Sequence, residues 1–153
     1  MPHQITNDQS LRKALEQLSA TQQRELGGLF VANVGHLSSD PRINRAVAAS
    51  TNAGISPQEL DEAYKSVKAF AIQSYTACGH DADWAAQAEH FVAAAATASL
   101  TPEEQSDVKG NCAWKAAMQA RMAKHCEMIL KDEGDVANEA EKQYALAEKF
   151  LLE

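Results

Sequence analysis

The stretch Asp83–Leu100, DWAAQAEHFVAAAATASL, decides the fold. In the helix that it predicts, Glu89 is the one charged side chain among the alanines, and apolar residues cover most of the circumference. A helix that is apolar nearly all round is usually buried on several sides. At about 18 residues it could barely span a bilayer, and Glu89 and His90 count against that interpretation. We therefore expect it to be the central helix of a compact all-α domain.

The composition is that of an ordinary globular protein. The chain has 153 residues, of which 45% are hydrophobic and 23% charged, so we expect one all-α domain over 1–153. Its net charge is -7 and its pI about 5.2. Because nucleic acids and anionic membranes attract lysine and arginine, an acidic chain without a basic run predicts neither as a partner.

The ends and the cysteines suggest a compartment. The N-terminal residues MPHQITNDQSLRKALEQ contain no basic stretch followed by an apolar core, so we expect no signal peptide. No segment predicts a transmembrane helix. The three cysteines, Cys78, Cys112 and Cys126, are an odd number without CxxC spacing. We therefore expect reduced thiols and a cytoplasmic protein.

Helix starts and stops are marked along the chain. Ser56 to Glu59 supply a capping serine, a proline at the first helical position and a glutamate at the third, and Ile55 and Leu60 can form a hydrophobic staple. Other starts are predicted at Asp40, Asp83, Thr101, Asn111 and Asp135, and stops at Gly79, Gly110 and Gly134.

These signals predict a compact bundle of about seven or eight helices around the Ala-rich central one. The expected helices are 7–18, 20–37, 41–51, 57–78, 83–99, 102–109, 112–132 and 136–152, with ends uncertain by about 2–4 residues. On 57–78 the helical period places Leu60, Tyr64, Val67, Phe70, Ala71 and Cys78 on one apolar face. The pair Gly27–Gly28 lies inside a helical pattern and predicts a kink or a close helix contact.

Polar residues inside the apolar faces are the candidate binding groups. Arg121 and His125 lie one turn apart on the helix 112–132. They either pair with carboxylates and solvent or bind an anionic group of a partner. Tryptophan, methionine and arginine are enriched in interfaces, so the predicted binding face is Trp114, Met118, Arg121, Met122 and His125. Asn33, also on an apolar face, is expected to cap a neighbouring backbone group.

Two functions follow from these residues. The first is a non-catalytic accessory or regulatory module that binds another protein. The second is a small helical enzyme or ligand sensor, with a small molecule held near His90, Arg121 and His125. The chain lacks GxSxG, HExxH, phosphate-binding glycine loops and EF-hand patterns, which favours the first function.

The cysteines and histidines do not predict a metal site or another cofactor. Zinc takes ligands in pairs a few residues apart, and Cys78–His80 is the one such pair. Because His125 and Cys126 are adjacent, they point about 100° apart on a helix. Cys112 lies in a first helical turn, where the helix dipole is expected to lower the thiol pKa.

Two segments resemble known motifs. Ala49–Ala63, ASTNAGISPQELDEA, looks like a helix-turn-helix, but its second helix begins with acids that would repel phosphates. Ser74–Gln105 resembles the all-α carboxymuconolactone decarboxylase and alkylhydroperoxidase-like family, where a redox Cys-x-x-Cys and a histidine precede an alanine-rich helix. Here Cys78 stands alone, with Asp81 at the second cysteine position, so the resemblance carries no catalytic pair to this chain.

Overall fold

The structure confirms the predicted all-α bundle. It is a computed structural model that describes residues 5–78, 83–102, 111–131 and 139–152, and these contain seven α-helices and no strand. The elements are α1 (Asp8–Glu16), α2 (Ala20–Ala32), the 3-10 helix η1 (Gly35–Leu37), α3 (Pro41–Ser50), α4 (Pro57–Cys78), α5 (Trp84–Leu100), α6 (Cys112–Lys131) and α7 (Glu139–Leu152). The helix expected over 102–109 lies almost entirely outside the described residues.

Side-chain caps set the helix starts where the sequence predicted them. Side-chain oxygens accept a backbone N–H of the first turn at Asp40, Ser56, Asp83 and Asn111. Each cap satisfies a donor that the helix itself leaves unpaired. The local sequence therefore determines these starts.

One predicted boundary is wrong. The helix expected over 20–37 ends at Ala32, and the chain turns through Asn33 and Val34 into η1. Gly35 is a poor helix former, which weakens the continuation. The Asn33 side chain also donates a hydrogen bond to Glu139 of α7 rather than to a backbone group, which was the cap expected from the sequence.

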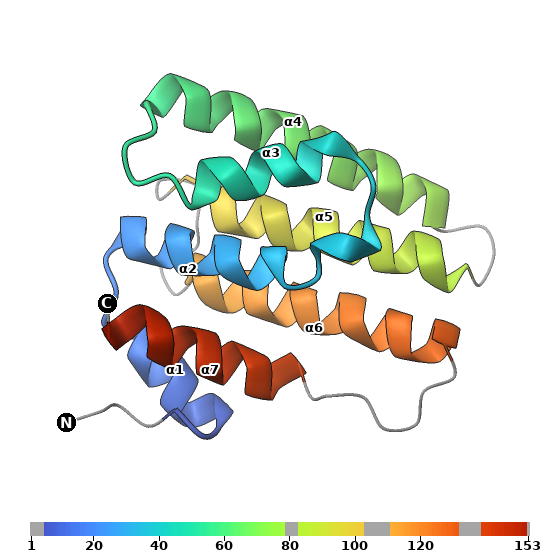
Figure 1. The fold of residues 1–153 in the computed structure, drawn as a ribbon. Helices are drawn as coiled ribbons and strands as arrows, with labels where there is room; N and C mark the ends of the chain where they lie inside the picture. The colour runs from blue at the N-terminus through green and yellow to red at the C-terminus, as the bar shows by residue number, and fades with distance from the viewer. Residues whose placement is uncertain (1–4, 79–82, 103–110, 132–138, 153) are drawn as a thin grey trace.

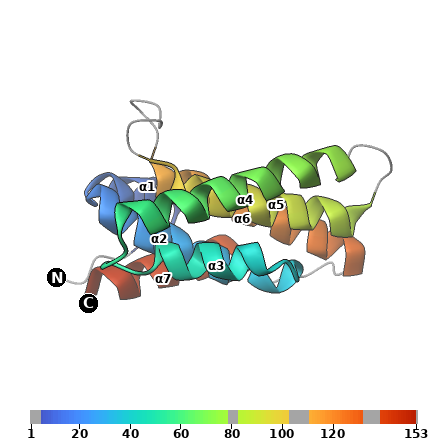
Figure 2. The same cartoon turned by 90° about the horizontal axis from the view of Figure 1, so that it is seen from above.

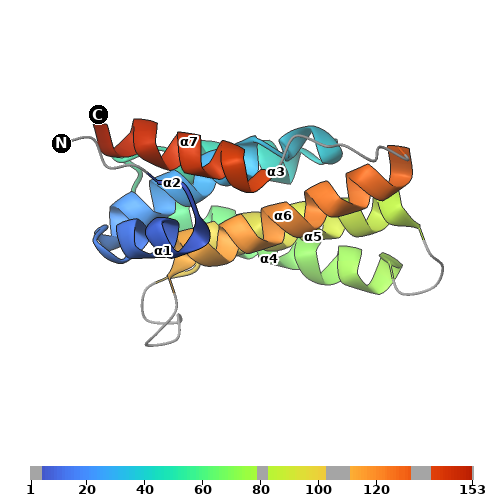
Figure 3. The same cartoon turned by 90° about the horizontal axis from the view of Figure 1, so that it is seen from below.

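The helices lie in two layers. Successive helices α4, α5 and α6 form one layer, and α2, α3 and α7 lie over it on one side (Figures 1 and 2). Seen from below, α6 and α5 lie between α7 and α4 (Figure 3). The most extensive helix contact in the described chain is between α5 and α6, followed by that between α4 and α5. This arrangement confirms α5 as the central helix.

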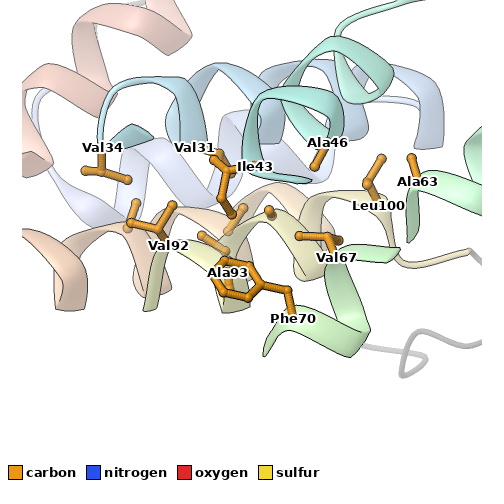
Figure 4. Packing of buried hydrophobic residues seen from close by; sticks show 14 of the residues in the cluster. Val31, Val34, Ile43, Ala46, Ala63, Val67, Phe70, Val92, Ala93 and Leu100 are labelled. Atoms are coloured by element: carbon orange, nitrogen blue, oxygen red, sulfur yellow. The ribbon is translucent and has the colours of Figure 1, made fainter. Parts of the chain in front are cut away.

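Small side chains line the contact surfaces of α5. Alanines of both helices are almost fully buried where α5 and α6 meet, among them Ala95, Ala96, Ala116 and Ala120. Larger residues pack against α5 from α3 in the other layer and from α4 beside it. Figure 4 shows Ile43 of α3 and Phe70 of α4 reaching toward Ala93 of α5.

A second core cluster lies between α1, α2, α6 and α7. It contains Ile5, Leu11, Leu15, Leu18, Leu26, Phe30, Ala113, Ala117 and Ala147. Trp114, Met118, Tyr144 and Phe150 pack against it while remaining partly buried. This second cluster therefore joins the two ends of the described chain to α2 and α6.

The glycine pair of α2 permits close helix contact. A Cβ added to Gly28 would lie 2.5 Å from the Cβ of Ser50 on α3, and one added to Gly27 would lie 3.1 Å from the Cβ of Ser99 on α5. The hydroxyls of these two serines lie 3.2 Å apart and are buried. The structure thus confirms the close contact that the sequence predicted as one alternative.

We expect Gly28→Ala to lower the free energy of unfolding by about 1–3 kcal/mol, because α3 would have to move away from α2. Gly35→Ala is the matched control, since an added Cβ there meets nothing within 4 Å. Urea unfolding followed by circular dichroism measures both. Equal stability of the two variants would show that the α2–α3 contact does not depend on Gly28.

Candidate functional site

The predicted binding face on α6 is largely covered. Trp114 and Met118 are partly buried against the second core cluster. The Arg12 guanidinium of α1 lies 4.9 Å from the Trp114 ring centroid. Met122 and His125, one and two turns further on, are exposed. The five residues therefore do not form one exposed surface, and their role in binding stays a prediction.

Arg121 holds three helices together. Its guanidinium donates to Asp8 of α1 at 2.7 and 3.0 Å and to Gln143 of α7 at 2.8 Å. Gln143 is fully buried and donates to the carbonyl of Ala117, and Tyr144 donates to Asp8 at 2.7 Å. The hydrogen bond from Arg121 is the main reason that the pKa of Asp8 is lowered. Arg121 is therefore already paired with a carboxylate of its own chain.

The second predicted site is not assembled. His90 faces α4, where its ring nitrogen Nδ1 contacts Ser74. Arg121 instead contacts α1 and α7, and His125 is exposed. The groove that His90 lines includes neither Arg121 nor His125.

The expectation for Cys112 is wrong. Burial raises the pKa of this thiol to about 11, although nearby backbone amides act in the opposite direction. Its Sγ lies 3.8 Å from the Gln23 side-chain oxygen. Desolvation disfavours the thiolate more than the start of α6 favours it. The residue is therefore not activated as a nucleophile.

Within the described residues, no group of three or more histidine, cysteine, aspartate or glutamate side chains could hold a metal ion. His80 and the side chain of Cys78, the pair singled out in the sequence, lie outside those residues.

Glu127 is a buried carboxylate with three basic partners, which sequence reasoning missed. Only 3% of the residue is exposed, and its carboxylate contacts His36 of η1 at 2.7 Å as well as Lys124 and Lys131 of α6. Burial by itself would raise the pKa of Glu127, but hydrogen bonds from Lys124 and His36 outweigh it and lower the pKa to about 2. The signal in the sequence was the spacing of the two lysines, because Lys124 lies three residues before Glu127 and Lys131 four residues after it.

Glu139 is a second buried carboxylate at the start of α7. Asn33 donates to its Oε1, while Oε2 is buried without a hydrogen-bond partner in the described structure. Burial raises the pKa of Glu139, and the bond from Asn33 opposes this only in part. Unlike Glu127, it is therefore stabilised in its protonated form. The two carboxylates connect α6 to η1 and α7 to Asn33 at the end of α2.

One surface of the described chain that could receive a ligand is a groove between α4 and α5. It has a volume of about 390 Å³ and is open to solvent along one side. Its lining is Lys68, Ala71, Ile72 and Tyr75 from α4 and His90, Ala94 and Thr97 from α5. Ile72 and Tyr75 are 63% and 69% exposed, although both are large and apolar. We call this surface the α4–α5 groove.

Two polar groups of α5 in the α4–α5 groove are largely satisfied inside the protein. Thr97 donates to the Ala93 carbonyl at 2.8 Å. His90 Nδ1 lies 3.0 Å from the Ser74 hydroxyl, and its ring centroid lies 5.4 Å from that of Tyr75. Burial lowers the pKa of His90, which favours the neutral ring, and a hydrogen bond to the Ala71 backbone opposes this only in part.

The sequence pointed to part of this groove only. His90 was a candidate residue, and Ala71 belonged to the predicted core face. Ile72 and Tyr75 lie outside the apolar face predicted for 57–78, and large apolar residues outside that face were the available signal. Ile72 and Tyr75 form part of a groove only because the neighbouring helices leave one side of α5 uncovered next to them.

The segment that resembles a helix-turn-helix consists of α3, a turn and α4. Ala63 is buried, and Ile55 and Leu60 pack against the core. The amide of Gly54 donates to the Asn52 side chain in the exposed turn. The first turns of α4 expose Glu59, Asp61 and Glu62. An acidic exposed helix start does not suit DNA phosphates.

Comparison of the chain with protein-family models, curated proteins and solved structures finds no match. The resemblance of Ser74–Gln105 to one enzyme family therefore rests on the quoted residues alone. In the described residues no helix combines the length and the hydropathy needed to cross a membrane.

The two buried carboxylates predict opposite effects of one substitution. At pH 7, Glu127→Gln should lower the free energy of unfolding by about 2–3 kcal/mol, because it removes a carboxylate with a lowered pKa and leaves its cations unpaired. Glu139→Gln should leave the stability unchanged or raise it, because it removes a poorly solvated charge.

The pH dependence follows the same signs, and urea unfolding between pH 3 and 8 measures it. Stabilisation by Glu127 is complete above its unfolded pKa, near 4.5, and is lost as the pH falls toward 2. The contribution of Glu139 is complete below 4.5 and is lost as the pH rises through its raised pKa. Equal destabilisation by both substitutions at pH 7 would contradict the assignment.

Proposed function

We propose that this protein is a non-catalytic accessory or regulatory module that binds another protein through the α4–α5 groove. The observation that carries the proposal is the exposure of Ile72 and Tyr75 beside an apolar, solvent-open groove. Contiguous exposed apolar surface of this kind marks interaction sites in water-soluble domains. We place the partner in the cytoplasm, because the cysteine spacing suggests reduced thiols.

The shape of the groove favours a helix of the partner. Its lining residues recur at helical spacing over about two turns of α4 and of α5. Ala71, Ala94 and Thr97 are small, so a helix could approach closely. Helix α6 packs on the other side of α5 in this way, along buried alanines.

The charge of the groove supports the same partner. Lys68 is the one lysine or arginine in its lining, which contains no aspartate or glutamate, whereas the chain as a whole has a net charge of -7. A cationic edge on an acidic protein is complementary to acidic residues of a partner. The occupant that fits is therefore an amphipathic helix with an apolar face and acidic flanks.

A small apolar ligand is the second candidate. The groove volume of about 390 Å³ lies within the range of small-molecule sites, roughly 300–1,000 Å³. Such sites bury most of their ligand, however, and this groove is open. The paired Ser74 and His90 do not form a catalytic dyad with an accessible nucleophile, because Ser74 is 6% exposed and does not line the groove.

Photo-crosslinking in cells of the native host tests the proposal. We expect Tyr75→p-benzoylphenylalanine to cross-link one protein, at a peptide with apolar residues at i, i+3, i+4 and i+7. The added charge of Ile72→Glu in the same chain should abolish this product. The matched control places the cross-linker at Leu152 of α7, which is 72% exposed, and should not yield the product.

A product that survives Ile72→Glu, or appears equally from position 152, would contradict docking in the groove. Absence of any protein product specific to position 75 would do the same. A small-molecule adduct at position 75 that Ile72→Glu removes would support the second candidate instead.

A further inference from the structure

We propose, building on the proposed function, that the α4–α5 groove selects a helix with a carboxylate at the Lys68 end and a hydrogen-bond donor at the His90 end, about two turns apart. The proposal names the chemistry of the partner helix. It rests on the contacts that Lys68 and His90 each make within the chain, and on the distance between them along the groove.

Lys68 has no carboxylate partner in the described structure. It is exposed, and its Nζ lies 5.5 Å from the Tyr64 ring centroid. Lys65, one turn earlier on α4, is instead paired with Asp61 at 2.9 Å. The lysines beside the buried Glu127 are paired as well. Lys68 is thus a cation on the edge of the groove that can attract a carboxylate from outside.

The hydrogen bonds around His90 define which nitrogen carries the proton. The Ser74 hydroxyl has one proton and lies 3.0 Å from both the Ala71 carbonyl and His90 Nδ1. A carbonyl can only accept, so the hydroxyl donates to Ala71 and accepts from Nδ1–H. In a neutral ring the other nitrogen, Nε2, is then an acceptor. His90 lines the groove, so this acceptor suits an N–H or O–H donor of the occupant.

Spacing along α4 relates the two groups. Lys68 and Tyr75 are seven residues apart, which corresponds to about 10.5 Å along a helix. Tyr75 lies against the His90 ring, so Lys68 and His90 mark the two ends of this interval. A helix lying along the groove would present its carboxylate and its donor at i and i+7. Apolar residues at i+3 and i+4 would cover Ile72 and Ala94 between them.

Three synthetic 18-residue helical peptides test the proposal with the whole protein. The first has Glu at i, Leu at i+3 and i+4 and Gln at i+7. The second replaces Glu by Lys, and the third replaces Gln by Met, which has similar length but no donor. Titration followed by ¹H–¹⁵N NMR gives both the dissociation constants and the amides that shift.

We expect the first peptide to shift amides of α4 and α5 and to bind about fivefold more tightly than the Lys peptide at low salt. Lys68→Glu should reverse this preference. Lys149 is an exposed residue of α7. The substitution Lys149→Glu changes the net charge by the same amount and should leave the preference for Glu over Lys unchanged. His90→Phe should remove the preference for Gln over Met and keep the preference for Glu over Lys.

The outcomes separate this proposal from the proposed function. Equal binding of all three peptides in the groove would overturn the selectivity while leaving helix docking in place. A charge preference that Lys149→Glu also reverses would show a net-charge effect and overturn the role of Lys68. Failure of all three peptides to shift α4 and α5 amides at millimolar concentration would overturn the proposal, and cross-linking at position 75 would still decide docking itself.

Discussion

The backbone of α5 can lie close to α2 and α6 because the side chains between them include alanine, glycine and serine. The alanines shared with α6 are fully buried, and a Cβ added to Gly27 would lie only 3.1 Å from that of Ser99. Contact at this distance gains dispersion energy along the whole helix length. It also leaves the helices little freedom to slide, since protein interiors are close-packed. The positions of α2 and α6 beside α5 follow from it.

Large apolar side chains hold the outer helices in a different way. The second core cluster joins α1 and α7 to α2 and α6, and Phe30 is its largest fully buried member. Apolar packing alone does not determine how these helices are rotated. The hydrogen bonds of Arg121 to Asp8 and Gln143 do so, because a planar guanidinium accepts few arrangements of its acceptors. A residue that suggested binding in the sequence thus has an intramolecular role.

The α4–α5 groove is a consequence of the same packing. Helices α2, α3, α4 and α6 surround α5 on several sides, and one edge of α5 beside α4 is left accessible. Because α5 is apolar nearly all round, that edge is also apolar. The exposed Ile72 and Tyr75 extend it onto α4. Lys68 and His90 then supply the polar groups that distinguish this surface from a general hydrophobic patch.

The sequence by itself determined where most helices begin and which one is central. Capping residues such as Ser56 and Asp83 act on amides two or three residues away, and an apolar circumference is a property of one segment. Only the tertiary structure decided which polar groups meet and which side of α5 stays accessible. Asp8 and Arg121 are 113 residues apart, and His36 and Glu127 are 91 apart. No local pattern encodes such pairs, because they depend on how whole helices pack.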